Sequence, residues 1–101
     1  MTKVPDILTA AERAAALSAL DGWTYADGAL HKAYAFAGFV EAFAFMTAGA
    51  LAAERLDHHP NWSNSYRKVD VSLSTHAAGG VTSLDIALAT AMEGVAARLL
   101  A

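Results

Sequence analysis

Residues 23–36 set the architecture of the chain and read Trp23-Thr24-Tyr25-Ala26-Asp27-Gly28-Ala29-Leu30-His31-Lys32-Ala33-Tyr34-Ala35-Phe36. Asp27-Gly28 is the pair that best supports a two-residue type I′ turn, because both residues adopt positive φ at low cost. Segments 23–26 and 29–36 are therefore expected to form the first two strands, joined as an antiparallel hairpin.

A helix is predicted on each side of this hairpin. Before it, Thr9 with Glu12 three residues later is a capping-box signature, and the Ala/Leu-rich run to Leu20 stops at Asp21-Gly22. After it, a helix is expected from Gly38 to about His58, because Pro60 disfavours helical backbone at His59. Phe39, Phe43, Met46 and Ala50 recur at helical spacing on one stripe of this helix. Its neighbouring stripe carries Val40, Thr47, Leu51, Glu54 and His58.

The C-terminal half is expected to add two strands and a helix. Val69, Val71, Leu73 and Thr75 alternate with Asp70, Ser72, Ser74 and His76, which is typical of a strand with one buried face. Segment 62–66 is its expected antiparallel partner, with Arg67-Lys68 as the turn, and Ala78-Gly79-Gly80 ends the strand. Thr82 and Asp85 form a second capping-box pattern, ahead of an apolar stripe of Leu84, Leu88, Ala91, Val95 and Leu99.

These elements predict an α+β fold in one domain over residues 1–101. The order is αββαββα, and the helices are expected to pack on one face of a four-stranded antiparallel sheet. The hydrophobic fraction is 55%, which is high for 101 residues. Because surplus apolar surface is often covered by another subunit, we expect a homodimer or homotetramer.

Charge and composition exclude several classes of protein. The net charge is −3 and the seven Lys and Arg residues are scattered, so we expect no direct nucleic acid binding. No cysteine is present to build a disulfide or a thiolate metal site, which fits a reducing compartment. The N-terminus lacks a signal-like apolar run and no segment reaches spanning length, so a cytoplasmic protein without membrane association is expected.

The candidate catalytic residues lie between Glu54 and Asp85. Glu54 and His58 are four apart on the predicted helix, so the carboxylate could hold the imidazole in one tautomer and favour its protonated form. The alternative is an exposed ion pair of little consequence. Asp85 is explained by its predicted capping box with Thr82, and we assign it a structural role at this point.

Three histidines could share one pocket. His58 and His59 leave the helix end at different angles because of Pro60, and His76 ends the alternating strand. If strand and helix end meet, such a cluster can supply both a general acid and a general base. Alternatively, the first two satisfy helix C-terminal carbonyls and His76 is an exposed loop residue. A zinc site is disfavoured because adjacent histidines rarely bind one metal and the H-E-x-x-H spacing is absent.

Taken together, these residues form a pattern with separated fixed positions. Glu54-Arg55-Leu56-Asp57-His58-His59-Pro60, Tyr66, His76 and Asp85 read E-x3-H-H-P-x5-Y-x9-H-x8-D. The pattern resembles the signature of the pterin-4a-carbinolamine dehydratase family. The resemblance extends through Phe43-Ala44-Phe45-Met46-Thr47 and Leu73-Ser74-Thr75-His76 and covers the chain from Thr9 onward.

The resemblance implies an αββαββα fold in dimers or tetramers, and dehydration of 4a-hydroxytetrahydropterin to quinonoid dihydropterin without metal or nucleotide cofactor. That reaction recycles the tetrahydrobiopterin used by aromatic amino acid hydroxylases. By position, the implied catalytic residues are His58, His59, His76 and Glu54. The implied substrate-binding residues are Asp57, His58, His59, Ser74, Thr75, His76 and Ala77, and Trp62 could add an aromatic face for a flat heterocycle.

The resemblance also brings an alternative and a departure. Animal members of the family act as dimerisation cofactors for a homeodomain transcription factor, so a binding module is the main rival to an enzyme. The presence of all three histidines favours the enzyme. The segment Ala77-Ala78-Gly79-Gly80 departs from animal members, because it lacks their acidic and cysteine side chains.

Overall fold

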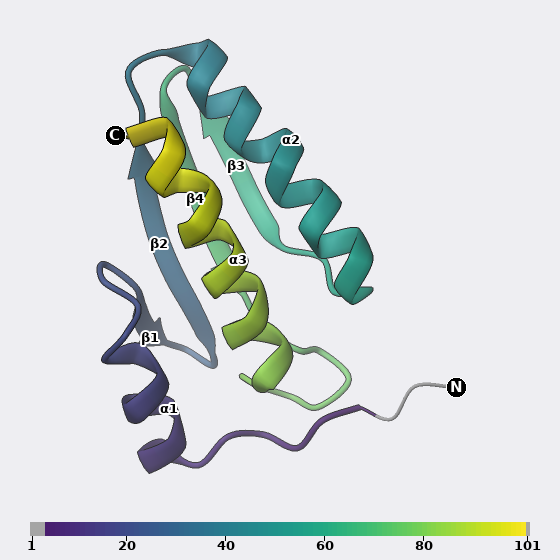
Figure 1. Ribbon diagram of the computed structural model, residues 1–101. Helices are drawn as coiled ribbons and strands as arrows, with labels where there is room; N and C mark the ends of the chain where they lie inside the picture. The colour runs from purple at the N-terminus through teal and green to yellow at the C-terminus, as the bar shows by residue number, and fades with distance from the viewer. Residues whose placement is uncertain (1–3, 101) are drawn as a thin grey trace.

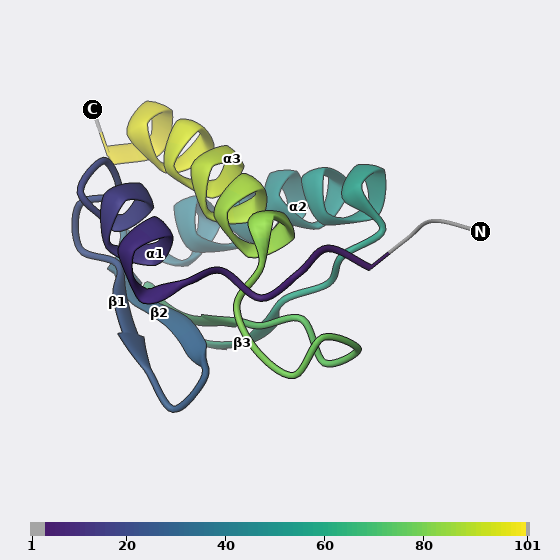
Figure 2. The ribbon, with the colours of Figure 1, turned by 90° about the horizontal axis from the view of Figure 1, so that it is seen from below.

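The helices and strands follow the predicted order along the chain in the computed structural model, which describes residues 4–100. They are α1 (Ala10–Leu17), β1 (Thr24–Ala26), β2 (Ala29–Ala35), α2 (Phe39–Leu56), β3 (Asn61–Ser65), β4 (Lys68–Leu73) and α3 (Ser83–Leu100). The four strands form one antiparallel sheet in the order β1-β2-β4-β3. All three helices lie on the same side of this sheet, as Figures 1 and 2 show, so the predicted α+β fold is confirmed.

The two hairpin turns differ in how well the sequence predicts them. Asp27 and Gly28 have φ of 51° and 77°, which confirms the first turn and its position. The second turn lies one residue earlier than predicted: Tyr66-Arg67 forms it, and Lys68 already begins β4. Tyr66 takes a φ of 53° although it is not glycine. The Asn64 side-chain amide stabilises this turn by donating to the carbonyls of Tyr66 and Lys68.

The first helix begins as predicted and ends early. Thr9 accepts a hydrogen bond from the Glu12 backbone, and the Glu12 carboxylate accepts one from the Thr9 backbone, so both halves of the capping box form. Helix α1 ends at Leu17, three residues before the predicted end at Leu20. Residues 18–22 form turns instead, and Leu20 turns inward to join the core.

Helix α2 buries a different face from the two stripes that stand out in the sequence. Its buried residues are Ala42, Phe45, Gly49, Ala52 and Ala53. Phe39, Val40, Phe43 and Leu51 are exposed. Four of these five residues are alanine or glycine, and their small side chains let α2 approach the sheet and α3 closely. For example, a β-carbon at Gly49 would come within 3.2 Å of the Trp62 ring.

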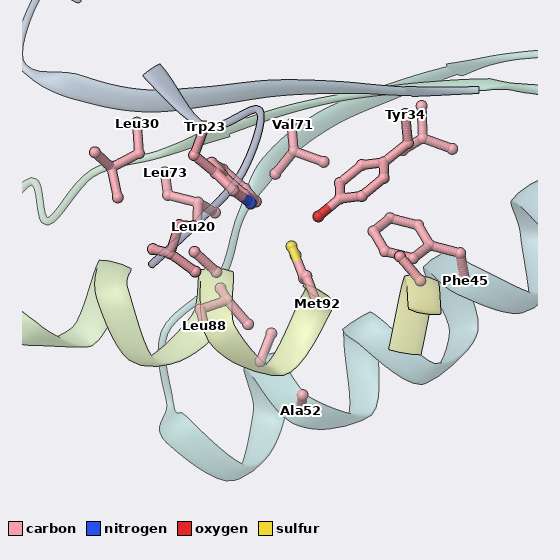
Figure 3. Close-up of a cluster of buried hydrophobic side chains, with 14 of the residues drawn as sticks. Leu20, Trp23, Leu30, Tyr34, Phe45, Ala52, Val71, Leu73, Leu88 and Met92 are labelled. Carbon is pink, nitrogen blue, oxygen red and sulfur yellow. The ribbon is translucent and has the colours of Figure 1, made fainter. Parts of the chain in front are cut away.

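The core lies between the sheet and the pair α2 and α3 (Figure 3). Leu30, Tyr34 and Val71 reach it from the sheet, while Phe45 and Met92 reach it from the helices. The buried residues of α3 are Asp85, Leu88, Ala89, Met92 and Ala96. The buried face is therefore rotated relative to the predicted stripe, whose other members Leu84, Ala91, Val95 and Leu99 are half-buried.

A part-buried group of hydrogen bonds lies beside these apolar side chains. Oε2 of Glu93 on α3 accepts hydrogen bonds from the Trp23 indole, the Lys32 ammonium group and the Tyr34 hydroxyl. The three donors come from β2 and the residue before β1, so this oxygen ties α3 to the sheet. Among residues 4–100, no helix is both long and apolar enough to cross a membrane.

Candidate functional site

A pocket of about 670 Å³ opens where the end of α2 meets the end of β4. Its walls come from three separate parts of the chain: the α2 exit, the segment after β4 and the N-terminal segment before α1. The lining residues are Val4, Arg55, Leu56, Asp57, His58, His59, Ser74, Thr75, His76 and Ala77. The three histidines singled out in the sequence therefore border one cavity.

The exit of α2 presents His58 and His59 in different directions. Asp57 adopts the left-handed conformation at φ 49°, and the backbone N–H groups of Asp57 and His58 donate to Glu54 and Ala53. The helix thus ends at Leu56, earlier than predicted. His58 is consequently turned away from the helix face that carries Glu54, and the predicted pairing of Glu54 with His58 is wrong.

The Glu54 carboxylate pairs with His59 instead. Its Oε1 lies 2.8 Å from His59 Nε2, and both side chains are largely exposed. An ion pair in this environment is strongly screened by water and contributes little free energy. Its effect here is to orient the His59 ring at the rim of the pocket.

His58 is held by a buried carboxylate that comes from α3. Its Nε2 lies 2.6 Å from Oδ1 of Asp85, and Asp85 has no exposed surface. Oδ2 of Asp85 accepts hydrogen bonds from the Thr75 hydroxyl and the Thr82 backbone N–H, both at 2.9 Å. The structural role assigned to Asp85 is therefore incomplete: it accepts the N–H of the capping box, and it also contacts a pocket histidine.

Two threonines complete the network around Asp85. The Thr75 and Thr82 hydroxyl oxygens are 2.8 Å apart, and Thr82 Oγ1 accepts the Leu84 N–H. The Thr75 hydroxyl, which the resemblance implies for substrate binding, is thus used to hold Asp85. No buried side-chain nitrogen or oxygen among the described residues lacks a partner. The network is fully satisfied, as a buried polar group requires.

His76 lies on a tight, closed loop after β4. The Thr75 N–H donates to Gly80, and the N–H groups of Ala78 and Gly79 return to the Thr75 carbonyl. Gly79 has a φ of 83°, which favours glycine at this position. The loop leaves His76 exposed, and His76 lines the cavity together with the residues of the α2 exit.

The N-terminal segment supplies a wall of the pocket that no sequence pattern predicts. The Leu8 N–H donates to the Val81 carbonyl, and Ile7 packs against Gly80, where a β-carbon would lie 3.4 Å from Ile7 Cδ1. These contacts fix the segment beside the loop that carries His76, so that Val4 lines the pocket. Figure 2 shows the segment passing below the start of α3.

The aromatic residues considered for the pocket do not line it. The Trp62 ring packs against Phe45 and Gly49 on the α2 side of the sheet. Tyr66 is exposed at the turn between β3 and β4. The expected aromatic face for a flat ligand is therefore not supplied by Trp62, and the apolar part of the pocket wall comes from Val4, Leu56 and Ala77.

The donor set of the pocket suits proton transfer. Neutral imidazole offers one donor and one acceptor nitrogen, and its protonated form offers two donors. Three imidazoles that line one cavity from two segments of the chain can therefore protonate one atom of a ligand and remove a proton from another. Within the described residues, no three His, Asp or Glu side chains are grouped closely enough to hold a metal ion.

Comparison with known proteins assigns the chain to a family. The family model described as pterin 4 alpha carbinolamine dehydratase matches residues 6–95. A protein of Chelativorans sp. that carries the family's name is 56% identical over 84 residues, which cover 81% of this chain and 86% of the relative.

Two solved structures are also similar. A transcriptional coactivator/pterin dehydratase from Brucella melitensis matches with a TM-score of 0.88 and 48% identity, over 90% of this chain and 99% of that one. A pterin dehydratase-like protein described as a RuBisCO assembly factor in the alpha-carboxysome shares the fold, with a TM-score of 0.63 and 24% identity over 74% of this chain and 89% of that one. The chain therefore belongs to the pterin-4-alpha-carbinolamine dehydratase family, and its curated relatives carry the name of a hydro-lyase.

Proposed function

We propose that the pocket converts 4a-hydroxytetrahydropterin to quinonoid dihydropterin and water by histidine acid–base catalysis, in tetrahydrobiopterin recycling. The observation that carries this proposal is the position of His58, His59 and His76 around one cavity of about 670 Å³. That volume lies within the range of small-molecule sites, roughly 300–1,000 Å³. A bicyclic pterin is a ligand of suitable size for it.

The elimination needs two proton transfers. A histidine in its imidazolium form protonates the departing 4a-hydroxyl, so the C–O bond breaks and water leaves. A neutral histidine accepts the proton from N5, and the electron pair of the N5–H bond forms the new double bond to C4a. His58 and His76 are assigned these two roles, and His59 orients the ring with support from Glu54. General acid–base catalysis of this kind contributes about 10²- to 10⁴-fold.

The other pocket residues are proposed to contact the ring rather than to transfer protons. Asp57, Ser74 and Ala77 line the cavity beside the histidines. Asp57 and Ser74 offer oxygen atoms to the polar edge of a pterin, while Ala77 offers an apolar surface. Thr75 acts indirectly, because its hydroxyl is bonded to Asp85.

A kinetic assay with a matched control tests the proposed activity. The 4a-carbinolamine is generated by a hydroxylase, and its loss is followed with wild type, His58→Ala, His76→Ala and His31→Ala. His31 lies on β2 away from the pocket, with Nε2 3.1 Å from the Ala26 carbonyl, so His31→Ala should keep full activity. The two pocket variants should lose about 10²-fold or more. A folded wild type that leaves the spontaneous rate unchanged would overturn the proposal.

The proposed assembly is a homo-oligomer that covers the outward face of α2. Phe39, Val40, Phe43 and Leu51 on this face have exposed fractions of 49%, 75%, 54% and 62%. The opposite face of the same helix is buried in the core. A helix that is apolar all round is normally covered on every side, and an exposed apolar strip on a soluble domain marks an interaction site.

A second copy of the chain is the proposed occupant of this face. The strip runs along one helix, so two copies related by a twofold axis can bury the same residues against each other. Light scattering should give wild type a mass at least twice 10.5 kDa. Phe43→Glu should lower that mass, whereas Ala97→Glu on the exposed side of α3 should not. A monomeric wild type at micromolar concentration would overturn the proposed assembly. A different protein would then be the candidate partner of this face.

A further inference from the structure

We infer that Asp85 is a positioning residue that fixes His58 in the tautomer with the proton on Nε2, so that Nδ1 is the proton acceptor of the pocket. The inference rests on the proposed function for its chemical meaning. Its structural part, the tautomer, can be measured without any activity. It also divides the two proton transfers between His58 and His76.

Backbone N–H groups, which can only donate, fix the direction of the hydrogen bonds around Asp85. The Leu84 N–H donates to Thr82 Oγ1, so the Thr82 hydroxyl proton is free to point at Thr75 Oγ1 at 2.8 Å. The Thr75 hydroxyl then donates to Oδ2 of Asp85. Oδ2 also receives the Thr82 backbone N–H, whose direction cannot reverse. Two donors therefore meet at Oδ2, which leaves Oδ1 as the oxygen that contacts His58, and a carboxylate accepts at both oxygens.

The tautomer of His58 follows from this arrangement. Oδ1 of Asp85 lies 2.6 Å from Nε2 and can only accept, so Nε2 must carry a proton. The bond to Asp85 is the single hydrogen bond of the His58 ring among residues 4–100. Nδ1 has no partner among these residues, whereas every buried side-chain nitrogen there has one. Nδ1 is therefore exposed, and His58 lines the pocket.

The role of His58 in the reaction is then the base. Nδ1 accepts the proton from N5, and the resulting imidazolium is stabilised by the buried carboxylate on its other side. The acid that protonates the leaving hydroxyl is left to His76, which has no such carboxylate partner within the described residues. After water has left, His58 returns its proton to solvent and His76 takes one up from solvent.

Replacing Asp85 by Asn should reverse the tautomer. The fixed Thr82 N–H requires the amide oxygen on its side, which turns the amide NH2 toward His58. Nε2 must then accept, and the proton moves to Nδ1, where it blocks the base. A change to the wrong tautomer in a carboxylate–histidine pair has cost about 10⁴-fold in another enzyme class.

Nitrogen-detected NMR of the imidazoles tests the structural part on wild type alone. At neutral pH the neutral form of His58, assigned through His58→Gln, should carry its proton on Nε2, and Asp85→Asn should move it to Nδ1. A wild-type His58 with its proton on Nδ1 overturns the inference, whether or not the protein is a dehydratase. Failure of the proposed function is separate: the tautomer is as inferred and wild type does not accelerate the reaction.

Kinetics then distinguish positioning from stability. Asp85→Asn should lower kcat by about 10²-fold or more with KM changed less than about threefold. The matched control is Glu93→Gln, which also removes a hydrogen-bonded carboxylate from α3 but lies outside the pocket. If Asp85→Asn does not fold, Thr75→Val serves as the second variant, since it removes one donor to Oδ2 and should lower kcat by a smaller factor. Folded Asp85→Asn with the kcat of Glu93→Gln contradicts the inference.

Discussion

Lys32 on β2 places its ammonium nitrogen 2.8 Å from Oε2 of Glu93 on α3. The same oxygen accepts hydrogen bonds from Tyr34 and Trp23. Burial raises the pKa of the Tyr34 hydroxyl, and its bond to the Glu93 carboxylate raises it further, so this hydroxyl keeps its proton and remains a donor. The Glu93 carboxylate therefore joins α3 to the sheet side of the core through three groups that all act as hydrogen-bond donors.

This contact should make stability depend on pH. Burial alone would raise the pKa of Glu93, but the hydrogen bonds from Lys32 and Tyr34 outweigh it and the pKa is lowered. The stabilisation is therefore complete above the ordinary value of 4.5 and is lost as pH falls through the lowered pKa. Glu93→Gln should unfold with about 1–3 kcal/mol less free energy at pH 7. Melting curves from pH 7 to pH 3 should show this gap closing, and a constant gap would contradict the prediction.

Glu54→Gln should have a small effect on activity. The Glu54 and His59 side chains are 77% and 61% exposed, and pairs this open to water contribute about 0–1 kcal/mol. We expect kcat/KM to fall less than about fivefold, and added salt should reduce the difference from wild type. The comparison is with Asp85→Asn in the same assay. A loss as large as that of His58→Ala would show that Glu54 takes part in proton transfer.

Two glycines in helix interiors should respond differently to alanine. Gly94 on α3 has nothing within 4 Å of its would-be β-carbon, so Gly94→Ala should stabilise the fold by about 0.5–1 kcal/mol. Gly49 on α2 faces the Trp62 ring at 3.2 Å. Gly49→Ala should lose this gain because the ring must move. Urea denaturation of both variants measures the difference, and equal stabilisation would mean that Trp62 is loosely held.

Gly28→Ala should weaken the first hairpin through the backbone alone. Gly28 has a φ of 77° and nothing within 4 Å of its would-be β-carbon. An alanine in the left-handed region costs about 1–2 kcal/mol. Asp27→Asn is the control, since asparagine tolerates that region as well as aspartate does. Thermal unfolding should show a lower midpoint for Gly28→Ala and almost none of that change for Asp27→Asn.

Local sequence signals predicted the parts of the fold whose cause is local. The Asp27-Gly28 turn and the Thr9–Glu12 capping box depend on residues within a few positions of one another. The meeting of His76 with the α2 exit was a condition that the element order left open, and it is met because β4 pairs between β2 and β3 in the sheet.

Other features depend on contacts that no local pattern carries. Helix α2 is apolar on every side, so periodicity could not show that Ala42 and Gly49 face inward while Phe43 faces outward. The left-handed Asp57 ends α2 before His58, which breaks the i,i+4 relation expected for Glu54. Asp85 satisfied a capping pattern, and that local explanation concealed its contact with a histidine 27 residues earlier.

The Thr82 amide proton is bonded to a carboxylate without exposed surface. Its exchange with deuterium requires this bond to open, and Asp85, which is buried and also bonded to Thr75 and His58, must leave its position for that to happen. Amides buried in this way commonly exchange by the opening of a whole cooperative unit. We expect exchange at Thr82 and heat inactivation to follow the same opening, so that the catalytic lifetime of the protein is set by how firmly α3 is docked.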